Sequence, residues 1–458
     1  MKVGRKPMRE GYLPTELVML IVEFIASDYT DEQRQKTLWS CCLVCRQWYD
    51  IALPLLYERP QLDKGNAFQK FANLLCPPGR AARIKPSLMT LGHSPRNFAS
   101  LVEHLDMGQL VHHSTKSLTA KLINRCKENL EVFRAPAASF GYGCLVPISK
   151  CENLTFLDLS LVIDKLSYLD IQQAVCELWN LHTLLLGRST VIDGDAHGFP
   201  KFLTEFQLSG RINFDPVRDK RRMIYPYFLW PRELYDLTLY HVTPLNGRTM
   251  RALLGFPPLS YNLNQLTIVS DSTAEPEALH EIPKRLNLLS VLRVPGDLVR
   301  PSFFDTVESL AREAAARRAE RAAAKSKPKA AADDDSDTDM SDIDGPSNDP
   351  PLKLLTTLIL DEPPSVGSDR ALGFELEDLA VRLENPEFLP DLEVVWLHPI
   401  YKDLPGREEL HKTLQSRFRA KFTERLQKWR PRPDREKPDI DEAVSKHSGV
   451  KTILDEGD

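Results

Sequence analysis

The chain lacks any uninterrupted apolar run that approaches the roughly 18–20 residues of a membrane-spanning helix. It also lacks a strong charge of one sign, because 59 Lys and Arg residues against 64 Asp and Glu residues leave a net charge of −5 over 458 residues. A chain so close to neutral has no global attraction to nucleic acid or to a membrane surface. Its length allows two or three compact units, or one elongated array.

Cysteine is sparse, and its eight positions are 41, 42, 45, 76, 126, 144, 151 and 176. This spacing excludes the dense disulfide framework of small secreted domains and favours free thiols in a reducing compartment. The sequence also contains no phosphate-cradling glycine loop, no GxSxG, no HExxH and no cluster of metal ligands. We therefore expect a non-catalytic protein without a cofactor or a metal site.

Two apolar stripes lie in the N-terminal stretch from residue 11 to residue 62. The first stripe consists of Leu17, Leu20, Ile21, Phe24 and Ile25. The second stripe consists of Leu38, Cys41, Cys42, Cys45 and Trp48. Both stripes have helical spacing, and Pro14 suits the first turn of the first helix. Residues 28–36 are polar and without periodicity, which predicts a loop between the two helices.

Two other interpretations of this stretch are a secretory signal and a metal or redox site. Basic residues precede the first stripe, but Pro14, Glu16 and Glu23 interrupt it and no small-residue cleavage site follows. Cys42 and Cys45 have the spacing of a zinc or redox pair, but zinc needs four ligands and no second pair lies nearby. Cysteines on an apolar stripe behave as small hydrophobes. A helical docking module is therefore favoured.

The same residues resemble the F-box family, in "LPTELVMLIVEFI" from Leu13, "LVCRQW" from Leu43 and the fungal-type ending "ALPLLYE". The inter-helix loop is longer than usual, and Leu56-Tyr57 stands where many members have Leu-Trp. F-boxes are three-helix modules that dock on a Skp-family adaptor, which attaches them to a cullin ubiquitin ligase. The resemblance implies an adaptor-binding surface of Leu13, Pro14, Leu17, Ile21, Ile25, Leu43, Val44 and Trp48.

Beyond residue 62, the pattern apolar-x-x-apolar-x-apolar occurs ten times. These hexamers begin at Val102, Leu130, Leu154, Leu181, Leu203, Leu234, Leu263, Leu289, Leu355 and Leu392. Most spacings are 22 to 31 residues, close to the leucine-rich repeat period of about 20–29. The array resembles leucine-rich repeats, although the Asn or Cys usual two residues beyond each hexamer is absent, which predicts irregular turns. A less regular α/β repeat array is the alternative fold.

Alternation along each strand places one set of residues opposite the inward apolar positions. In a solenoid this set lines the concave face: Asp106, Arg134, Phe156, Asp158, Asp236, Tyr240, Arg293, Trp396 and His398. Mixed charges with aromatic residues are typical of protein–protein hot spots. Any single position also fits an ordinary solvated sheet residue, whereas the face as a whole favours binding of a target protein.

Three segments lie outside this pattern. Residues 215–230 combine basic and aromatic side chains, but the cluster is short and lacks a nucleic-acid-binding motif, so a loop anchored by aromatics is favoured. Residues 311–352 join an Ala- and Arg-rich helix to an acidic segment with the composition of disorder. There Ser336 and Ser341 precede acidic residues, as in acidophilic kinase sites, and a solubilising spacer is the alternative. A stripe from Leu410 to Leu426 predicts a capping helix.

The expected fold is α+β or α/β repeat, with a three-helix F-box, an irregular leucine-rich-repeat solenoid and a disordered acidic insertion. The expected divisions are a basic N-terminus (1–10), the F-box (11–62), the solenoid (63–310), the insertion (311–352), the last repeats with a capping helix (353–432) and a polar tail (433–458). The predicted function is a substrate-recognition subunit of an SCF-type ubiquitin ligase, in the cytoplasm, the nucleus or both. The alternatives are a scaffold that delivers no substrate and an unrecognised enzyme built on the repeat frame.

Overall fold

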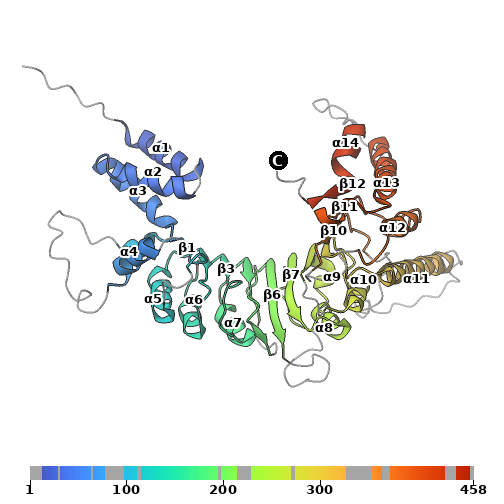
Figure 1. Cartoon of the computed structure of the whole chain (residues 1–458), viewed down its shortest axis with the longest axis horizontal. Coiled ribbons are helices and arrows are strands. Elements are labelled where there is room, and N and C mark those ends of the chain that lie inside the picture. Colours follow the sequence, from blue (N-terminus) through green and yellow to red (C-terminus); the bar gives the residue numbers. More distant parts are fainter. Residues whose placement is uncertain are drawn as a thin grey trace, which may run out of the picture. The chain divides into compact units, whose positions relative to one another are not determined.

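The computed structural model describes residues 13–28, 31–62, 65–77, 97–110, 115–193, 198–213, 228–269, 274–325, 352–363, 372–428 and 440–453. The chain divides into two compact units, whose elements are labelled in Figure 1. Unit 1 comprises residues 1–166 and 170–189, and unit 2 comprises residues 167–169 and 190–458. This division falls inside residues 63–310, which the sequence assigns to a single solenoid.

Unit 1 begins with α1 (Thr15–Asp28), α2 (Asp31–Cys42), α3 (Arg46–Glu58) and α4 (Gly65–Leu75). The first three helices share one buried core, whose largest members are Val18, Val22, Leu38, Leu53 and Leu56. The N-terminal region is therefore helical, as predicted. The prediction of a loop at residues 28–36 is wrong, because α2 begins at Asp31.

A buried arginine explains why this polar stretch is helical. Arg34 is only 4% exposed, and its guanidinium donates to the carbonyl oxygens of Ala26 at 3.1 Å and Leu55 at 2.9 Å. The carboxylate of Glu58 lies 3.8 Å from the same group. Arg34 thus ties α2 to the end of α1 and to α3. An apolar periodicity cannot reveal a helix that is held by one buried cation.

The second apolar stripe is divided between two helices. Cys41 and Cys42 end α2 and are buried, and this burial raises the pKa of both thiols. Cys45 precedes α3 in extended conformation and is exposed, so its expected place on a buried stripe is wrong. Trp48 is half-buried against the shared core. All eight cysteines are free thiols.

The rest of unit 1 contains four parallel strands in the order β1-β2-β3-β4. They are β1 (His104–Asp106), β2 (Val132–Arg134), β3 (Phe156–Asp158) and β4 (Thr183–Leu185). The connecting elements are η2 (Phe98–Leu101), α5 (Lys116–Cys126), η3 (Tyr142–Cys144), α6 (Leu145–Ile148) and α7 (Tyr168–Val175). One register row of buried side chains crosses all four strands: Leu105, Phe133, Leu157 and Leu184.

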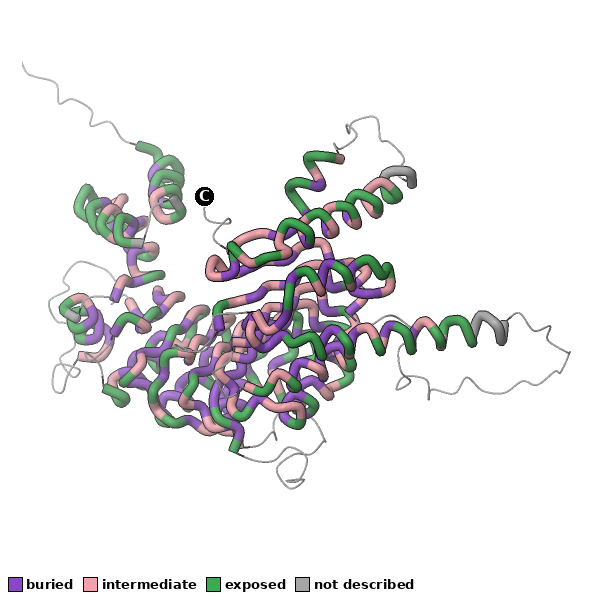
Figure 2. Tube along the Cα trace, turned by 45° about the vertical axis from the view of Figure 1, so that its right-hand side comes forward, coloured by how far each residue is buried: buried purple, intermediate pink, exposed green. Residues whose placement is uncertain are grey.

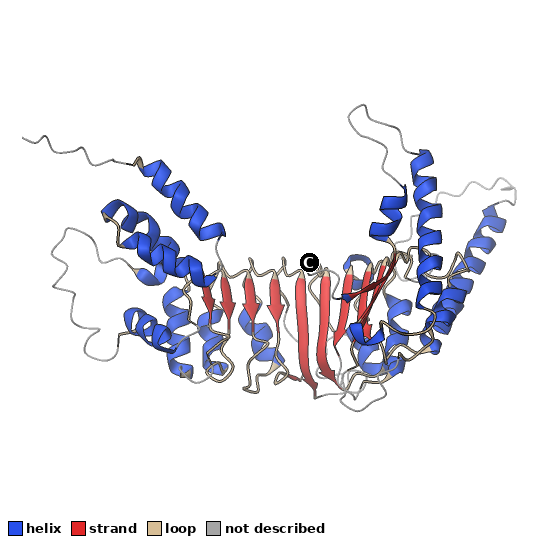
Figure 3. Ribbon diagram, turned by 45° about the horizontal axis from the view of Figure 1, so that its top comes forward, coloured by secondary structure: helices blue, strands red, loops and turns tan. Residues whose placement is uncertain are grey.

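Unit 2 contains parallel strands in the order β6-β7-β8-β9-β10-β11-β12, with β5 paired to β6 (Figure 3). They are β5 (Val191–Ile192), β6 (Glu205–Ile212), β7 (Asp236–Thr243), β8 (Gln265–Val269), β9 (Val291–Pro295), β10 (Thr357–Asp361), β11 (Val394–Leu397) and β12 (Gly449–Thr452). The intervening helices are α8 (Gly247–Leu253), α9 (Leu259–Asn262), η4 (Pro276–Glu281), α10 (Ile282–Arg285), α11 (Pro301–Lys325), α12 (Leu376–Arg382), η6 (Pro399–Tyr401), α13 (Arg407–Lys428) and α14 (Ile440–His447).

Every predicted hexamer contains a strand, and each of these strands begins two residues after the first residue of its hexamer. Burial alternates along β1, β2, β3, β4, β10 and β11, whereas β6 and β8 each contain three consecutive buried residues. Figure 2 colours the chain by burial. In unit 2 one register row is buried on every strand from β6 to β12: Phe206, Leu237, Leu266, Leu292, Leu358, Val395 and Val450. The chain is therefore a helical N-terminal region followed by an α/β region with parallel strands.

Asparagine side chains bond turn carbonyls at a position that the sequence analysis did not expect. Asn129, Asn153 and Asn180 each stand immediately before a hexamer, and each donates to a turn carbonyl oxygen one strand earlier at 2.6–3.0 Å. Asn262 makes the same bond in unit 2 at 2.5 Å. These bonds satisfy backbone acceptors at the turns. The asparagine that bonds the turn therefore stands directly before the hexamer in these four cases, and not two residues beyond it.

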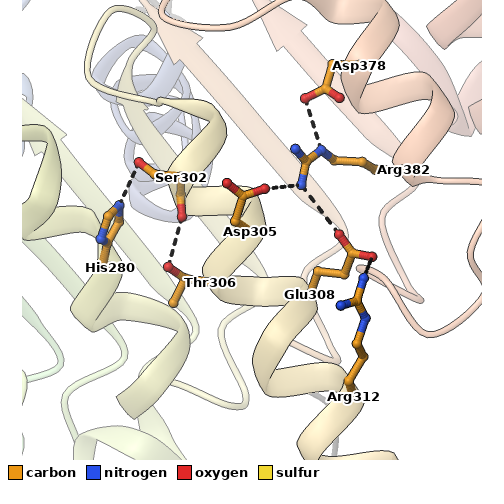
Figure 4. A network of polar contacts seen from close by, with 8 residues as sticks. All are labelled: His280, Ser302, Asp305, Thr306, Glu308, Arg312, Asp378 and Arg382. Carbon is orange, nitrogen blue, oxygen red and sulfur yellow. Dashed lines mark hydrogen bonds and ion pairs between the residues drawn. The ribbon is translucent and has the colours of Figure 1, made fainter.

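The first turns of α11 belong to the body of unit 2. Their buried side chains are Phe303, Phe304 and Val307. Arg382 of α12 donates to Asp305 at 2.7 Å and lies 3.5 Å from Glu308, so two carboxylates of α11 fasten it to α12 (Figure 4). The helix begins at Pro301, before the predicted insertion at 311–352. The acidic segment with Ser336 and Ser341 lies outside the described residues.

Two predictions about the C-terminal part are corrected by the structure. Residues 433–458 are not only a polar tail, because they include α14 and β12. The helix α13 buries Leu410, Leu414 and Phe418 on the expected stripe, but it is not the last element, since β12 follows it and pairs with β11. The sequence does not predict β12, because this strand has four residues and lacks the hexamer pattern.

We expect Arg34→Ala to destabilise the α1–α3 bundle by about 2–4 kcal/mol, because it leaves the carbonyl oxygens of Ala26 and Leu55 without their buried charged donor. Hydrogen exchange of peptides from α2 in the full-length chain measures this change. The control is Arg46→Ala, which removes an exposed cation 4.0 Å from Asp50 and should change exchange little. Equal effects of the two variants would contradict the role assigned to Arg34.

We expect Asn153→Ala to lower the free energy of unfolding by about 0.5–1.5 kcal/mol, because the carbonyl oxygen of Glu128 loses its side-chain donor. Urea unfolding measures this change. The exposed Lys150, on the preceding turn, offers Lys150→Ala as the control. An Asn153→Ala variant as stable as that control would show that the asparagine bonds do not stabilise the turns.

Candidate functional site

The helix α1 buries one face and leaves its other apolar face in solvent. Val18 and Val22 are completely buried, whereas Leu17 and Ile21 are 48% and 40% exposed. Both exposed residues belong to the surface predicted to bind an adaptor. Exposed apolar side chains that lie together are typical of protein-interaction sites.

The turn between α2 and α3 adds a second exposed apolar group, Leu43 at 70% and Val44 at 62% exposure. Gln47 of α3 donates to the carbonyl oxygen of Leu13 at 3.2 Å and to Thr15 at 3.0 Å. This side chain therefore fastens the turn to the start of α1. The two parts of the predicted surface, 30 residues apart in sequence, are brought together by these bonds.

We call this surface the docking face, and define it as Leu13, Pro14, Leu17, Ile21, Ile25, Leu43, Val44 and Trp48. Ile25 and Trp48 are half-buried against the core, and the other six are exposed. Four further exposed apolar residues on α1 and α2 lie outside the surface that the resemblance implies: Met19, Leu20, Phe24 and Trp39. The sequence places Leu20 and Phe24 on the first apolar stripe, whereas Met19 and Trp39 belong to neither stripe.

Four of the predicted target-binding residues meet on the strands of unit 1. Asp106, Arg134 and Asp158 occupy one register row of β1, β2 and β3. The guanidinium of Arg134 donates to Asp106 at 3.1 Å, lies 3.9 Å from Asp158, and stands 5.6 Å from the centre of the Phe156 ring. One guanidinium therefore pairs with two carboxylates within the face, which leaves a carboxylate in excess.

The predicted residues of unit 2 lie on β7, β9 and β11, and two of them have partners that sequence reasoning missed. Arg293 makes two hydrogen bonds to Asp361 of β10, at 2.6 and 3.0 Å. Lys451 of β12 stands 5.2 Å from the centre of the Trp396 ring. Asp361 could have been predicted, because it directly follows a hexamer. Lys451 could not, because it lies on β12, which lacks the hexamer pattern.

The three other predicted residues of unit 2 have distinct surroundings. His398 follows β11, accepts a hydrogen bond from the Ile400 amide at 3.4 Å, and lies 3.9 Å from Glu362. Tyr240 on β7 packs edge-on against His241, with ring centres 4.4 Å apart. Asp236 begins β7 and is treated with Glu205 below.

Asp236 and Glu205 face each other across the β6–β7 pair as Cα partners. Burial, with a smaller contribution from the Glu205 charge, raises the pKa of Asp236 to about 6. A carboxyl with a raised pKa binds its proton more tightly in the folded than in the unfolded chain. Ionisation of Asp236 near neutral pH therefore opposes folding.

The basic and aromatic segment 215–230 is described only from Phe228 onward. Phe228 and Trp230 are buried, and the indole of Trp230 donates to the carbonyl oxygen of Leu253 at 2.6 Å. The C-terminal end of this segment is thus anchored by aromatics, as the sequence predicts. Its basic residues lie outside the described residues.

Within the described residues, no group of three or more His, Cys, Asp or Glu side chains is placed to hold a metal ion. The same part of the chain contains no helix that is both long and apolar enough to cross a membrane. The surfaces with distinctive chemistry are therefore the docking face and the two strand faces.

We expect Asp236→Asn to be more stable than the wild type at pH 7.5, with a difference that shrinks as pH falls to about 4. In the wild type, protonated Asp236 contributes to the stability of the folded chain at low pH, and this contribution is lost as pH rises through about 6. Thermal unfolding midpoints across this range measure it. Glu233→Gln, on the exposed turn before β7, is the control. A difference that is constant with pH would contradict the assignment.

Comparison with known proteins agrees with the position of the docking face. Residues 11–63 match a family model described as F-box-like. The chain is similar to the F-box protein YDR306C of Saccharomyces cerevisiae, with 27% identity over 257 residues that cover 53% of this chain and 48% of the relative. It is also similar to the protein pof5 of Schizosaccharomyces pombe, with 26% identity over 156 residues that cover 34% of this chain and 39% of the relative.

The chain spans about half or less of the length of these curated relatives. The likeness to the Saccharomyces protein extends well beyond the 53 residues of the F-box-like match. This chain therefore carries an F-box-like domain at its N-terminus and is homologous to fungal F-box proteins.

Proposed function

We propose that this chain is the substrate-recognition subunit of an SCF-type ubiquitin ligase, in the cytoplasm, the nucleus or both. Its docking face binds a Skp-family adaptor, and through it a cullin. The observation that carries the proposal is the exposure of Leu17, Ile21, Leu43 and Val44 beside a separate, filled core. The three-helix core is filled without these side chains, so only a binding partner can bury them.

The strand faces of the two units bind the target protein in this proposal. The parallel strands are degenerate leucine-rich repeats, and support for this comes from the two-residue offset between each hexamer and its strand. Mixed charges and aromatic side chains line these faces. The subunit itself is non-catalytic. It acts by proximity, because tethering raises the effective concentration of the target near the transfer machinery, and the transfer chemistry belongs to its partners.

A scaffold that binds the adaptor without delivering a substrate is the second candidate. The observation in its favour is that the arginines of the strand faces are already paired, Arg134 with Asp106 and Arg293 with Asp361. A paired arginine offers less to a partner than an unpaired one. Only a target whose abundance depends on this protein separates the two candidates.

We expect wild-type chain to capture a recombinant Skp-family adaptor at one-to-one stoichiometry, and the double variant Leu17→Asp, Ile21→Asp to lose at least 90% of the captured adaptor. Two charges placed on an apolar interface remain desolvated and unpaired, which costs several kcal/mol. Co-purification with a tagged adaptor measures the capture. Because both residues are exposed, the variant should keep the wild-type unfolding midpoint.

The matched control is Leu161→Asp, which places the same charge on an exposed leucine of unit 1 outside the docking face. It should capture adaptor as the wild type does. A folded wild-type chain that captures no adaptor would contradict the proposal, as would equal losses in the control and the docking-face variant.

A further inference from the structure

The strands of unit 2 are parallel, so they begin at one edge of the sheet, which we call the strand-start edge (Figure 3). Backbone hydrogen bonds join the turns that lead into β6 to β10. The Tyr235 amide donates to the carbonyl oxygen of Thr204 at 2.8 Å, and the Asn264 amide donates to that of Tyr235 at 2.9 Å. The Ser290 amide donates to Asn264 at 2.8 Å, and the Thr356 amide donates to Ser290 at 2.9 Å. These turns therefore follow one another along the edge.

Each of these turns carries an exposed apolar side chain. We call this set the edge row, and it consists of Phe202, Tyr235, Tyr261, Leu288 and Leu354, which are 37–60% exposed. The row extends over four strand spacings, from β6 to β10, which is about 19 Å. Exposed apolar side chains that lie together are typical of protein-interaction sites. The edge row is separate from both the docking face and the strand faces.

Two rings of the edge row are held in place by polar neighbours. Asn264 donates to the Tyr235 hydroxyl at 2.7 Å, and the ammonium group of Lys201 stands 5.4 Å from the centre of the Phe202 ring. Both rings remain exposed despite these contacts. Their side chains are therefore partly preorganised, which lowers the entropy cost of ordering them in a complex.

A groove of about 630 Å³ lies at the β6–β7 end of the edge row. Its aromatic lining includes Phe199 and Trp230, which belong to the segments that lead into β6 and β7. The same two segments carry Phe202 and Tyr235 of the row. A groove of this size, with apolar walls and a few polar groups, can take a large apolar side chain from a partner.

Two cations line this groove, and neither has a carboxylate partner. In the part of the chain that the structure describes, no ion pair or hydrogen bond reaches the side chain of Lys201 or Arg232. Glu233 lines the same groove, but it forms no ion pair with these two described cations. An Asp or Glu side chain from a partner would therefore gain charge-assisted hydrogen bonds there.

A second positive cluster precedes Leu288 in the chain. The carboxylate of Glu281 is only 5% exposed, and three cations surround it: Arg251 at 3.2 Å, Lys284 at 3.2 Å and Arg285 at 3.3 Å. One carboxylate balances one of these three charges, so two positive charges remain in excess. Arg285 ends α10, three residues before Leu288. This excess beside the edge row favours an acidic partner.

We propose that the strand-start edge of unit 2 binds an acidic–apolar segment of a partner protein. Apolar side chains of the segment cover the edge row and enter the groove, while its Asp or Glu side chains pair with Lys201 and Arg232 and approach the cations around Glu281. An extended segment of about six residues, or a helix of about four turns, spans the row. This surface goes beyond the proposed function, because adaptor capture and target binding by the strand faces do not require it.

The test is a selection from a displayed library of random peptides, each about 16 residues long so that either form can span the row, on immobilised full-length chain. We expect the recovered peptides to combine Asp or Glu with two or more large apolar residues. A synthetic peptide from the selection should bind the Lys201→Ala, Arg232→Ala double variant about tenfold more weakly or worse. The Tyr261→Ala, Leu288→Ala double variant should show a loss of about the same size. All four residues are exposed, so both variants should keep the wild-type unfolding midpoint.

Three single variants are the controls. Lys150→Ala removes an exposed cation of unit 1, and Trp396→Ala removes a partly exposed ring from the strand face. Both should bind the selected peptide as the wild type does. Glu233→Gln removes a carboxylate from the groove and should bind the acidic peptide at least as tightly as the wild type. Added salt should weaken the binding to wild type more than the binding to the Lys201→Ala, Arg232→Ala variant.

The proposal is overturned if no peptide is recovered, if the recovered peptides are not acidic, or if either double variant binds the selected peptide unchanged. An alternative occupant of the edge is the acidic stretch of this chain, residues 333–344, whose seven aspartates can be replaced by serine. The proposal expects this replacement to leave the peptide affinity unchanged. A gain of about tenfold would show that the chain's own segment competes for the edge, and would overturn the assignment to a partner.

Discussion

The buried register row, one apolar side chain from each parallel strand, is the interaction on which both units depend. Strands of three to eight residues are not stable alone, so each is stabilised by the neighbours that pack against its buried apolar side chain. In unit 1 the row runs from Leu105 to Leu184, and in unit 2 from Phe206 to Val450. Because the buried row fixes which side chains alternate outward, it also determines the composition of the strand faces, including Glu205 and Asp236.

The N-terminal helices differ from the strands, because they carry more apolar residues than their core can bury. Val18 and Val22 fill the space between α1, α2 and α3, while Leu17 and Ile21 of the same helix stay in solvent. Arg34 and Gln47 hold the three helices so that the exposed residues lie together. The docking face thus presents apolar side chains, whereas the strand faces present charged and aromatic side chains.

The sequence was sufficient to predict what depends on periodicity. Ten hexamers gave ten strands, and the helical spacing from Leu17 to Ile25 identified the exposed stripe. Features that depend on a single long-range polar contact could not be predicted from the sequence. The helix α2 packs around Arg34, and Arg293 pairs with Asp361, which lies 68 residues later in the chain. The strand β12 could not be predicted either, because its four residues carry no hexamer pattern and form a strand by pairing with β11.

The central claim is that the docking face is an interface whose partner is a Skp-family adaptor. Hydrogen exchange of the full-length chain with and without the adaptor tests it most directly. The account predicts slowed exchange in peptides that cover Leu13–Ile25 and Leu43–Trp48, with unchanged exchange in the strands of unit 2. Protection confined to the strand units, or none at all in a mixture at high concentration, would contradict it.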